Sequence, residues 1–363
     1  MTIEDTPSLK VGIVGYGFAG ATFHAPLIRA TAGLELTCVT TSKAQRVLET
    51  LPQVAVRTTP AELIADPGID LVVIATPNET HYPLATAALE AGKHVVIDKP
   101  FTLDVAQAKA LIRLAEQRAR KLSVFHNRRW DGDFLTIAKL IESGVLGDLR
   151  HMESHFDRYR PLVQDRWRES AAPGGGLWYD LGIHLADQAL QLFGKPSAVW
   201  MDLNRQRAGA LADDWFHAVL HYDRLRVILH ASALAAAPAP RFVLHGTAGS
   251  FVKFGLDTQE AALRSGKRPG GADWGTDPLP GTLTLGDSQP PAPIIYPGLQ
   301  GDYTYFYAAM RDAITLGTPL PVSAQSACDA MEIIELGLES ARTSRLVHIL
   351  KRPEGDKVER EYF

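Results

Sequence analysis

Two ionisable side chains four residues apart, Asp180 and His184, are the first candidates for chemistry in this sequence. On a helix this spacing puts both side chains on one face. A histidine titrates near neutral pH, and a nearby carboxylate would raise its proton affinity and orient its ring. We therefore expect an acid–base pair here. A third candidate, Lys99, follows an apolar strand-like run and precedes Pro100, so it would face a ligand beyond the end of that strand.

Three glycines at 174–176 precede the acid–base pair and would let the backbone pass close to a ligand. Asp180 and His184 could also bind a metal ion together. No third ligand follows at a suitable spacing, so we expect no metal site.

A glycine-rich stretch, GYGFAG, matches the pattern G-x-G-x-x-G. It follows a strand-like run and opens a helix-like stretch, which is the context that dinucleotide binding requires. Gly15 would allow the tight turn, Gly17 would let the backbone approach a pyrophosphate, and Gly20 would let helix and strand pack closely. Phe18 and Ala19 would lie at the helix N-terminus, where free N–H groups bind phosphate.

The choice between NAD and NADP depends on the end of the second strand-like run, at 36–40. An acid there would bind the ribose 2′-hydroxyl of NAD, but Glu35 precedes the run and lies at its wrong end. Hydroxyl and basic residues end and follow the run instead: Thr40, Thr41, Ser42, Lys43 and Arg46. These residues suit a 2′-phosphate, so the sequence favours NADP, with NAD as the alternative. They could also merely cap the next helix.

Two further segments end strand-like runs, where ligands bind in sheets of this kind. Thr76, Pro77 and Asn78 follow the fourth run, and we expect this loop to face the nicotinamide half of the cofactor. His81 either belongs to that site or is a surface residue at a helix start. Asp98 ends the fifth run and is a candidate for the same site.

The elements that would position these residues alternate along the chain up to residue 126. Six apolar runs, rich in Val, Ile and Leu, are typical of parallel strands buried on both faces. They lie at 11–14, 36–40, 54–57, 71–75, 94–97 and 122–126. Helix-like stretches separate them, which predicts a doubly wound, mostly parallel α/β sheet. We expect residues 1–126 to form a Rossmann dinucleotide-binding domain.

The pattern changes after Asn127, where longer β-type runs predict a large open, mainly antiparallel sheet. They lie at 149–159, 198–203, 215–222, 226–232 and 242–245, with helix-like stretches at 134–142, 181–193, 302–316 and 324–342. We expect residues 127–363 to form an α+β substrate-binding and oligomerisation domain whose C-terminal helix packs back on the first domain. Residues 265–298, rich in Gly and Pro, predict a long surface loop that covers a site or an interface.

Composition excludes several classes of protein. The chain has 363 residues, with 46% hydrophobic and 21% charged, as in globular proteins of about two domains. A net charge of −4 gives no reason to expect nucleic-acid binding. Cys38 and Cys328 form no disulfide framework. The N-terminus does not resemble a signal peptide, and prolines and an arginine interrupt the apolar run at 227–244, so we expect a cytoplasmic protein without membrane spans.

Together these motifs resemble those of the glucose–fructose oxidoreductase, inositol dehydrogenase and rhizopine catabolism (Gfo/Idh/MocA) family. The resemblance rests on GYGFAG, the TPN-x-x-H loop at 76–81, Asp98-Lys99-Pro100 and the run from Gly176 to His184, in order along nearly the whole chain. The phrases FHAP, FHNRRW and ESHFDR further resemble its NADP-dependent scyllo-inositol dehydrogenase-like branch. The family usually has Glu-Lys-Pro, so Asp98 is one methylene shorter than expected.

The resemblance implies an oxidoreductase that transfers hydride between a nicotinamide and a secondary alcohol of a cyclic polyol or sugar, without a metal. It implies that Lys99 hydrogen-bonds the reacting oxygen, that His184 moves the proton and that Asp180 binds substrate. Lys99, kept cationic, would then stabilise charge that develops on an alkoxide.

Other residues take candidate roles from the same resemblance. Asn127, Trp167 and Arg168 look like the residues near the nicotinamide ribose. His155 and Asp157 would share one face of a strand and could meet the polyol, or they are ordinary polar residues of a sheet face. His24 has the same two interpretations.

Two other functions fit the same motifs. One is a non-catalytic NADP-binding sensor or regulator, although Lys99, Asp180 and His184 are all present. The other is an NAD-dependent glycoside hydrolase, which would return the hydride to the same substrate. The open sheet and the family resemblance suggest a homodimer or homotetramer.

Overall fold

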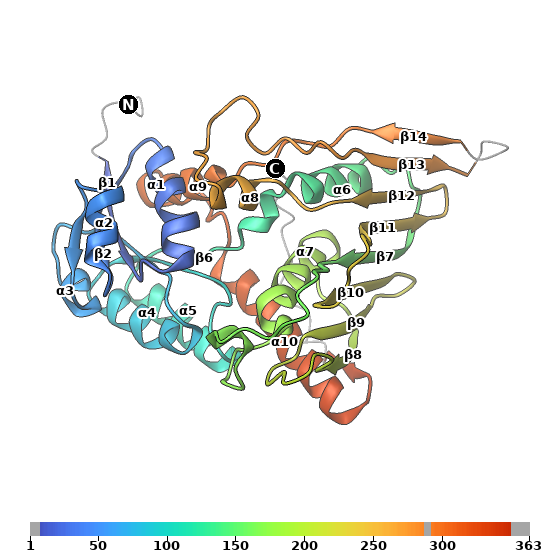
Figure 1. The fold of residues 1–363 in the computed structure, drawn as a ribbon, viewed down its shortest axis with the longest axis horizontal. Helices are drawn as coiled ribbons and strands as arrows, with labels where there is room; N and C mark the ends of the chain where they lie inside the picture. Colours follow the sequence, from blue (N-terminus) through green and yellow to red (C-terminus); the bar gives the residue numbers. More distant parts are fainter. Residues whose placement is uncertain (1–7, 287–291, 350–363) are drawn as a thin grey trace.

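The computed structural model describes residues 8–286 and 292–349, and its first half holds a six-stranded parallel sheet (Figure 1). The strands are β1 (Leu9–Val14), β2 (Leu34–Thr40), β3 (Ala55–Arg57), β4 (Leu71–Ile74), β5 (His94–Ile97) and β6 (Leu122–Val124). Their order in the sheet is β3-β2-β1-β4-β5-β6, so the direction of winding reverses between β1 and β4. The predicted doubly wound parallel sheet is confirmed. A ligand is expected beyond the carboxyl ends of the strands, at that reversal.

Helices cover this sheet because its strands are apolar on both faces. Every residue of β4 is fully buried, which requires cover on each side. The helices are α1 (Ala25–Ala30), α2 (Ala44–Thr50), α3 (Pro60–Ile64), α4 (His81–Glu90) and α5 (Val105–Gln117).

The second half of the chain builds a nine-stranded sheet in the order β14-β13-β12-β11-β7-β10-β9-β8-β15. The strands are β7 (Leu149–His155), β8 (Ala198–Asn204), β9 (Trp215–His221), β10 (Arg226–Ser232), β11 (Pro240–Gly246), β12 (Gly249–Phe254), β13 (Gly281–Leu285), β14 (Pro293–Tyr296) and β15 (Val347–His348). Among the described residues, β7 and β10 pair in parallel and the other pairs are antiparallel. The predicted mainly antiparallel sheet is therefore confirmed as a mixed sheet.

The nine-stranded sheet buries one face only. Along β9, the side chains of Phe216, Ala218 and Leu220 are fully buried, and the residues between them are half-exposed. Helices pack on the buried face: α7 (Ile183–Phe193) contacts β10, and α10 (Ala324–Thr343) contacts β8. The other helices of this half are α6 (Gly132–Glu142), α8 (Gln259–Arg264) and α9 (Thr304–Thr315).

The last two helices contact the first half of the chain. Arg311 of α9 donates a hydrogen bond to Ala32 O at 2.6 Å. α10 packs on α5 and on β6, and the Ser123 hydroxyl donates to Val322 O at 2.8 Å, just before α10. The backbone N–H of Val105 donates to the Glu335 carboxylate at 2.7 Å. The chain thus returns to the first sheet before its last strand, β15, joins the edge of the second (Figure 1).

The prediction of a long loop at 265–298 is wrong in part. This stretch contains β13 and β14, which extend the second sheet beyond β12. Pro293 opens the edge strand β14, a position that tolerates proline because the edge leaves N–H groups unpaired. Residues 287–291 lie outside the described residues. Within the described ranges, no helix is both long enough and apolar enough to cross a membrane.

Candidate active site

The glycine loop leaves β1 where the strand order reverses. Gly15 has φ +95°, and a Cβ there would lie 2.7 Å from Ala75 O, so a side chain is excluded. A Cβ on Gly20 would collide with Gly15 O. A Cβ on Gly17 would have no other atom within 4 Å, so this backbone borders open space. The loop therefore has the tight turn, the close packing and the room for a phosphate that dinucleotide binding needs.

The helix that follows begins at Phe18 and Ala19 and contains a π-helical turn over Gly20–His24 before α1. Phe18 is half exposed and meets the ring of Phe23 edge-on, with the centroids 5.9 Å apart. Phe18 thus borders the space that a dinucleotide would use.

A groove beside the loop is lined by Gly17 and Phe18 and by Thr41, Ser42 and Lys43. None of the described residues that line it is acidic. Two hydroxyls and an ammonium at the end of β2 fit a 2′-phosphate, as the sequence predicted.

Two other residues were predicted for this groove. Thr40 also lines it, although its side chain is buried, and its hydroxyl accepts a hydrogen bond from Gly15 N at 3.0 Å. Thr40 therefore holds the loop in place. The side chain of Arg46, in α2, lies outside the described residues.

The loop after β4 is tied to its neighbours by side chains that contact backbone. His81 is fully buried, so its interpretation as a surface residue is wrong. Its ring nitrogens lie 2.9 Å from Pro100 O and 3.0 Å from Thr76 O. Asn78, next to Pro77, donates to Gly174 O at 3.2 Å. These contacts join the loops after β4 and β5 to the glycine-rich segment of the second half.

Lys99, just beyond β5, reaches across to Asp180. Its ammonium donates to Asp180 Oδ1 at 2.8 Å and to Asp180 O at 2.6 Å. The side chains are 13% and 22% exposed, so the pair borders solvent. The charges of Lys99, Arg168 and Arg158 hold the pKa of Asp180 well below its ordinary value, against the effect of burial. Asp180 therefore stays ionised and anchors the lysine.

His184 does not pair with Asp180, so the predicted acid–base pair is wrong in its geometry. A π-helical turn at Trp178–Gly182 precedes α7, and its wider winding breaks the i,i+4 stacking of a regular α-helix. Burial, with Lys99 and Arg128 nearby, lowers the pKa of His184 well below 6.5. Its Nδ1 is buried without a hydrogen-bond partner in the described part of the chain. His184 is thus a neutral imidazole at neutral pH.

Asp98 acts on the backbone of the lysine. Its Oδ1 accepts a hydrogen bond from Lys99 N at 2.8 Å, and its Oδ2 lies 4.0 Å from Nε2 of His24. His24 is fully buried and lies 2.6 Å from the Tyr307 hydroxyl. Asp98 therefore supports the turn at Lys99, and the buried ring of His24 does not reach open space.

Of the three residues expected near the nicotinamide ribose, Arg168 lies at the Lys99–Asp180 pair. Asn127 is buried three residues beyond the end of β6 and opens a 3₁₀ turn. The Arg168 guanidinium stacks over the Trp167 ring at 4.6 Å, and its Nε is 3.4 Å from Asp180 Oδ1. Arg168 thus shares the carboxylate that holds Lys99.

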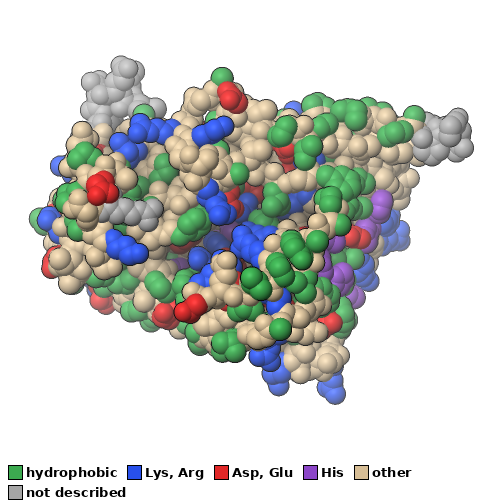
Figure 2. Space-filling view, in the orientation of Figure 1, with side chains coloured by type: hydrophobic (Ala, Val, Ile, Leu, Met, Phe, Trp, Pro, Cys, Tyr) green, Lys and Arg blue, Asp and Glu red, His purple; other side chains and the backbone are tan. Residues whose placement is uncertain are grey.

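His155 and Asp157 share one face of the sheet, as their spacing predicted, but the structure does not bring them to Lys99. His155 lies 2.8 Å from Glu153 and 3.5 Å from Asp157, and Asp157 lies 3.6 Å from His230. The intervening Phe156 is buried on the other face, toward the helices. The two residues belong to the half-exposed face, where histidines gather (Figure 2).

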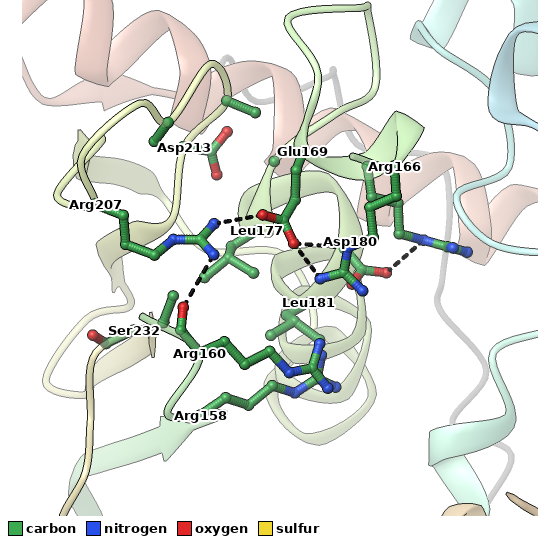
Figure 3. A pocket seen from close by; sticks show the side chains of 15 residues that line it. Arg158, Arg160, Arg166, Glu169, Leu177, Asp180, Leu181, Arg207, Asp213 and Ser232 are labelled. Carbon is green, nitrogen blue, oxygen red and sulfur yellow. Dashed lines mark hydrogen bonds and ion pairs between the residues drawn. The ribbon is translucent and has the colours of Figure 1, made fainter. Parts of the chain in front are cut away.

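Five arginines next to Asp180 were not identified from the sequence as a group. Arg158, Arg160, Arg166, Arg168 and Arg207 line one pocket with Asp180 and Glu169 (Figure 3). Four of them lie within one stretch, 158–168, whose density of arginine was the available signal. In the space-filling view, Lys and Arg side chains gather in the hollow between the two halves of the molecule (Figure 2).

Comparison with protein families matches nearly the whole chain. Residues 9–126 match the oxidoreductase family with an NAD-binding Rossmann fold, and residues 138–349 match the C-terminal alpha/beta domain of the same Gfo/Idh/MocA family.

Individual relatives are similar over most of their length. The uncharacterized oxidoreductase YdgJ of Escherichia coli is 51% identical, over 92% of this chain and 97% of YdgJ. IolW of Bacillus subtilis, a scyllo-inositol 2-dehydrogenase (NADP(+)), is 40% identical over 94% of this chain and 96% of IolW. The solved structure of YPO2259 from Yersinia pestis is 50% identical, covers 96% of this chain and 99% of its own, and has a TM-score of 0.92. With both domain models matched and the site built on the motifs described above, the chain belongs to the Gfo/Idh/MocA family of NAD(P)-dependent oxidoreductases.

Proposed function

We propose that this protein is an NADP-dependent dehydrogenase that acts on a secondary alcohol of a cyclic polyol or sugar. The observation that carries the proposal is the Lys99–Asp180 pair, which borders solvent beyond the end of β5, near the reversal of the sheet. The glycine loop and its groove fit a dinucleotide. When bound, the nicotinamide would accept or return the hydride.

Lys99 binds and polarises the reacting oxygen. An ammonium group has three N–H donors, and Asp180 takes two of them, through Oδ1 and O. The third N–H remains for a substrate oxygen. The ionised carboxylate of Asp180 pairs with the Lys99 ammonium group, which can stabilise an alkoxide as it develops.

His184 moves the proton. Burial keeps its imidazole neutral, so it can accept the hydroxyl proton during oxidation and return it during reduction. Asp180 acts as a positioning residue for both Lys99 and Arg168. No step in this scheme requires a metal.

The preference for NADP rests on two observations. Thr41, Ser42 and Lys43 line the groove at the end of β2, where an enzyme for NAD would be expected to carry an acid. IolW, 40% identical, is named as an NADP(+) enzyme. Its name also supports an inositol-like substrate, and we extend that substrate class to this chain.

The test is reduction of NADP and NAD, followed at the nicotinamide absorbance, across inositols, aldoses and cyclic diols. We expect turnover with NADP and at least one inositol or sugar. Tight NADP binding without turnover on any member would favour a sensor. Release of a sugar leaving group without net NADPH formation would favour the redox-neutral hydrolase.

The half-exposed face of the second sheet is our proposed contact between subunits, giving a homodimer or homotetramer. The mass measured by light scattering after size-exclusion chromatography tests this, and a monomer would contradict it.

A further inference from the structure

The pocket next to the Lys99–Asp180 pair holds more positive than negative side chains, and we call it the arginine pocket. It is lined by Arg158, Arg160, Arg166, Arg168 and Arg207, with Asp180 at the border to Lys99. The space between these side chains, with the open solvent at its mouth included, is about 520 Å³. The side chains converge on it from the segment after β7, from the helix start at Asp180 and from the loop after β8 (Figure 3).

Three of these arginines have carboxylate partners. Arg166 Nε donates to Glu169 at 2.7 Å. Arg207 donates to Asp214 at 2.9 Å and lies 3.1 Å from Glu169. Arg168 lies 3.4 Å from Asp180, which Lys99 also uses. The acids around the pocket are therefore already engaged.

Arg158 and Arg160 have no such partner. Among the described residues, no carboxylate lies within 4.0 Å of either guanidinium, and neither makes a side-chain hydrogen bond. Arg158 lies over the Phe156 ring at 4.8 Å. Burial lowers the pKa of Arg158 to about 10, against the more distant charges of Asp180 and Glu260, so it remains charged at neutral pH. In Figure 3 the two guanidinium groups point the same way, and no dashed line joins either to a partner.

Two half-buried, unpaired guanidinium groups favour an anion. Partial burial of a charge is unfavourable unless a partner compensates for it. A carboxylate or phosphate compensates well, because its oxygens accept the paired N–H groups of a guanidinium.

The position of the pocket points to the substrate as the source of that anion. The pocket contains Asp180, which holds Lys99, so it is continuous with the reacting centre. It shares no lining residue with the groove of the glycine loop. The guanidinium that lies over the ring of Phe18, in that loop, belongs to Arg264, at 5.7 Å.

We propose that the substrate is an anionic polyol or sugar, and that Arg158 and Arg160 bind its carboxylate or phosphate while Lys99 binds the reacting oxygen. This inference rests on the proposed dehydrogenase function and narrows its substrate class.

The first experiment compares matched probes with NADP. The probes are scyllo-inositol, myo-inositol and myo-inositol 1-phosphate, and D-glucose, D-glucose 6-phosphate and D-glucuronate. We expect kcat/KM for an anionic probe to exceed that of its neutral counterpart at least tenfold. Comparison of the phosphate probes with the carboxylate probe should identify which anion is preferred. Equal or better turnover of the neutral probes would overturn the proposal and leave the dehydrogenase function intact.

The second experiment uses Arg158→Gln and Arg160→Gln. Each should lower the anionic-to-neutral ratio of kcat/KM by about tenfold to hundredfold, since each removes a charged hydrogen bond. Arg158→Lys keeps the positive charge but removes the paired N–H donors of the guanidinium, so it should lower this ratio less than Arg158→Gln does. Arg113→Gln, on the exposed surface of α5, is the matched control and should leave the ratio unchanged. An equal loss with neutral and anionic probes would indicate a structural role and overturn the proposal.

A binding measurement separates the two proposals. Calorimetric titration of the NADPH-loaded protein with the same probes needs no turnover. Binding of an anionic probe that Arg158→Gln abolishes, without turnover of any probe, would support the anion site and contradict the dehydrogenase. Weaker NADPH binding in the arginine variants, with probe binding unchanged, would assign the arginines to the cofactor pyrophosphate and overturn the proposal.

Discussion

The two sides of the cleft are built in different ways. The cofactor side is mainly backbone: Gly15 turns, Gly17 leaves open space and Thr40 supports the loop. The opposite side is mainly charged side chains, in which Asp180 holds Lys99 and Arg168. A backbone site depends on shape and tolerates few substitutions, whereas a site of paired charges can change its preference through one residue. Binding of a dinucleotide is thus expected to be fixed more firmly than the choice of substrate.

The largest expected effect is on the charged side. Lys99→Met should lower kcat about thousandfold, because it removes the donor to the reacting oxygen, while NADPH binding is retained. Stopped-flow kinetics and NADPH fluorescence measure the two effects. Lys139→Met, on the exposed surface of α6, is the control. A near-normal kcat in this variant would contradict a catalytic role for Lys99 and, with it, the catalytic function proposed for the charged side.

On the backbone side, Gly15→Val should raise the Kd for NADPH about hundredfold. A Cβ would lie 2.7 Å from Ala75 O, at a φ of +95° that L side chains rarely adopt. Gly271→Val is the control, since a Cβ there would have no neighbour within 4 Å. Fluorescence titration gives Kd, and circular dichroism checks folding. Unchanged NADPH affinity would contradict the cofactor site.

Thr41→Asp tests whether the groove selects the cofactor. We expect the ratio of kcat/KM for NADP to that for NAD to fall about tenfold, because the new carboxylate repels a 2′-phosphate. Thr41→Asn introduces a side chain of nearly the same shape as Asp but without its charge, so it should shift the ratio much less. An unchanged ratio would show that the phosphate pocket lies elsewhere.

The smallest effect in the neutral range concerns pH. The pKa of His184 is lowered well below 6.5, so His184 stays a free base until the pH falls through that lowered value. The kcat/KM for alcohol oxidation should therefore be nearly flat from about pH 8 to pH 6.5 and fall only at lower pH. His184→Asn should lower kcat/KM and remove the fall of kcat/KM at low pH, the acid limb of the profile. A limb that persists in the variant would assign the titration to another group.

The cofactor side could be predicted from sequence because its signals are local. Each parallel strand is a short apolar run, and the glycines have roles set by their own backbone and their immediate neighbours. The predicted strands agree with β1 to β6 to within a few residues.

The substrate side could be predicted only in part, because its contacts are long-range. A spacing of two put His155 and Asp157 on one face but could not say which face meets the helices. A spacing of four assumed a regular helix, and the π-helical turn before His184 is not visible in that spacing. Arg207 reaches Glu169 only after the loop beyond β8 folds against the arginine-rich stretch, where Arg207 also donates to Arg160 O.

The return of α10 to the first sheet has a consequence for synthesis on the ribosome. Ser123 bonds to Val322, 199 residues later in the chain, and α10 then packs on α5. The apolar surface of α5 and β6 that α10 covers stays open until nearly the whole polypeptide has emerged. Domains generally fold in order from the N-terminus during synthesis. The N-terminal half of this chain, however, cannot complete its packing before α10 has been synthesised. A fragment that ends at residue 126 should therefore aggregate during expression, although it carries every strand of its own sheet.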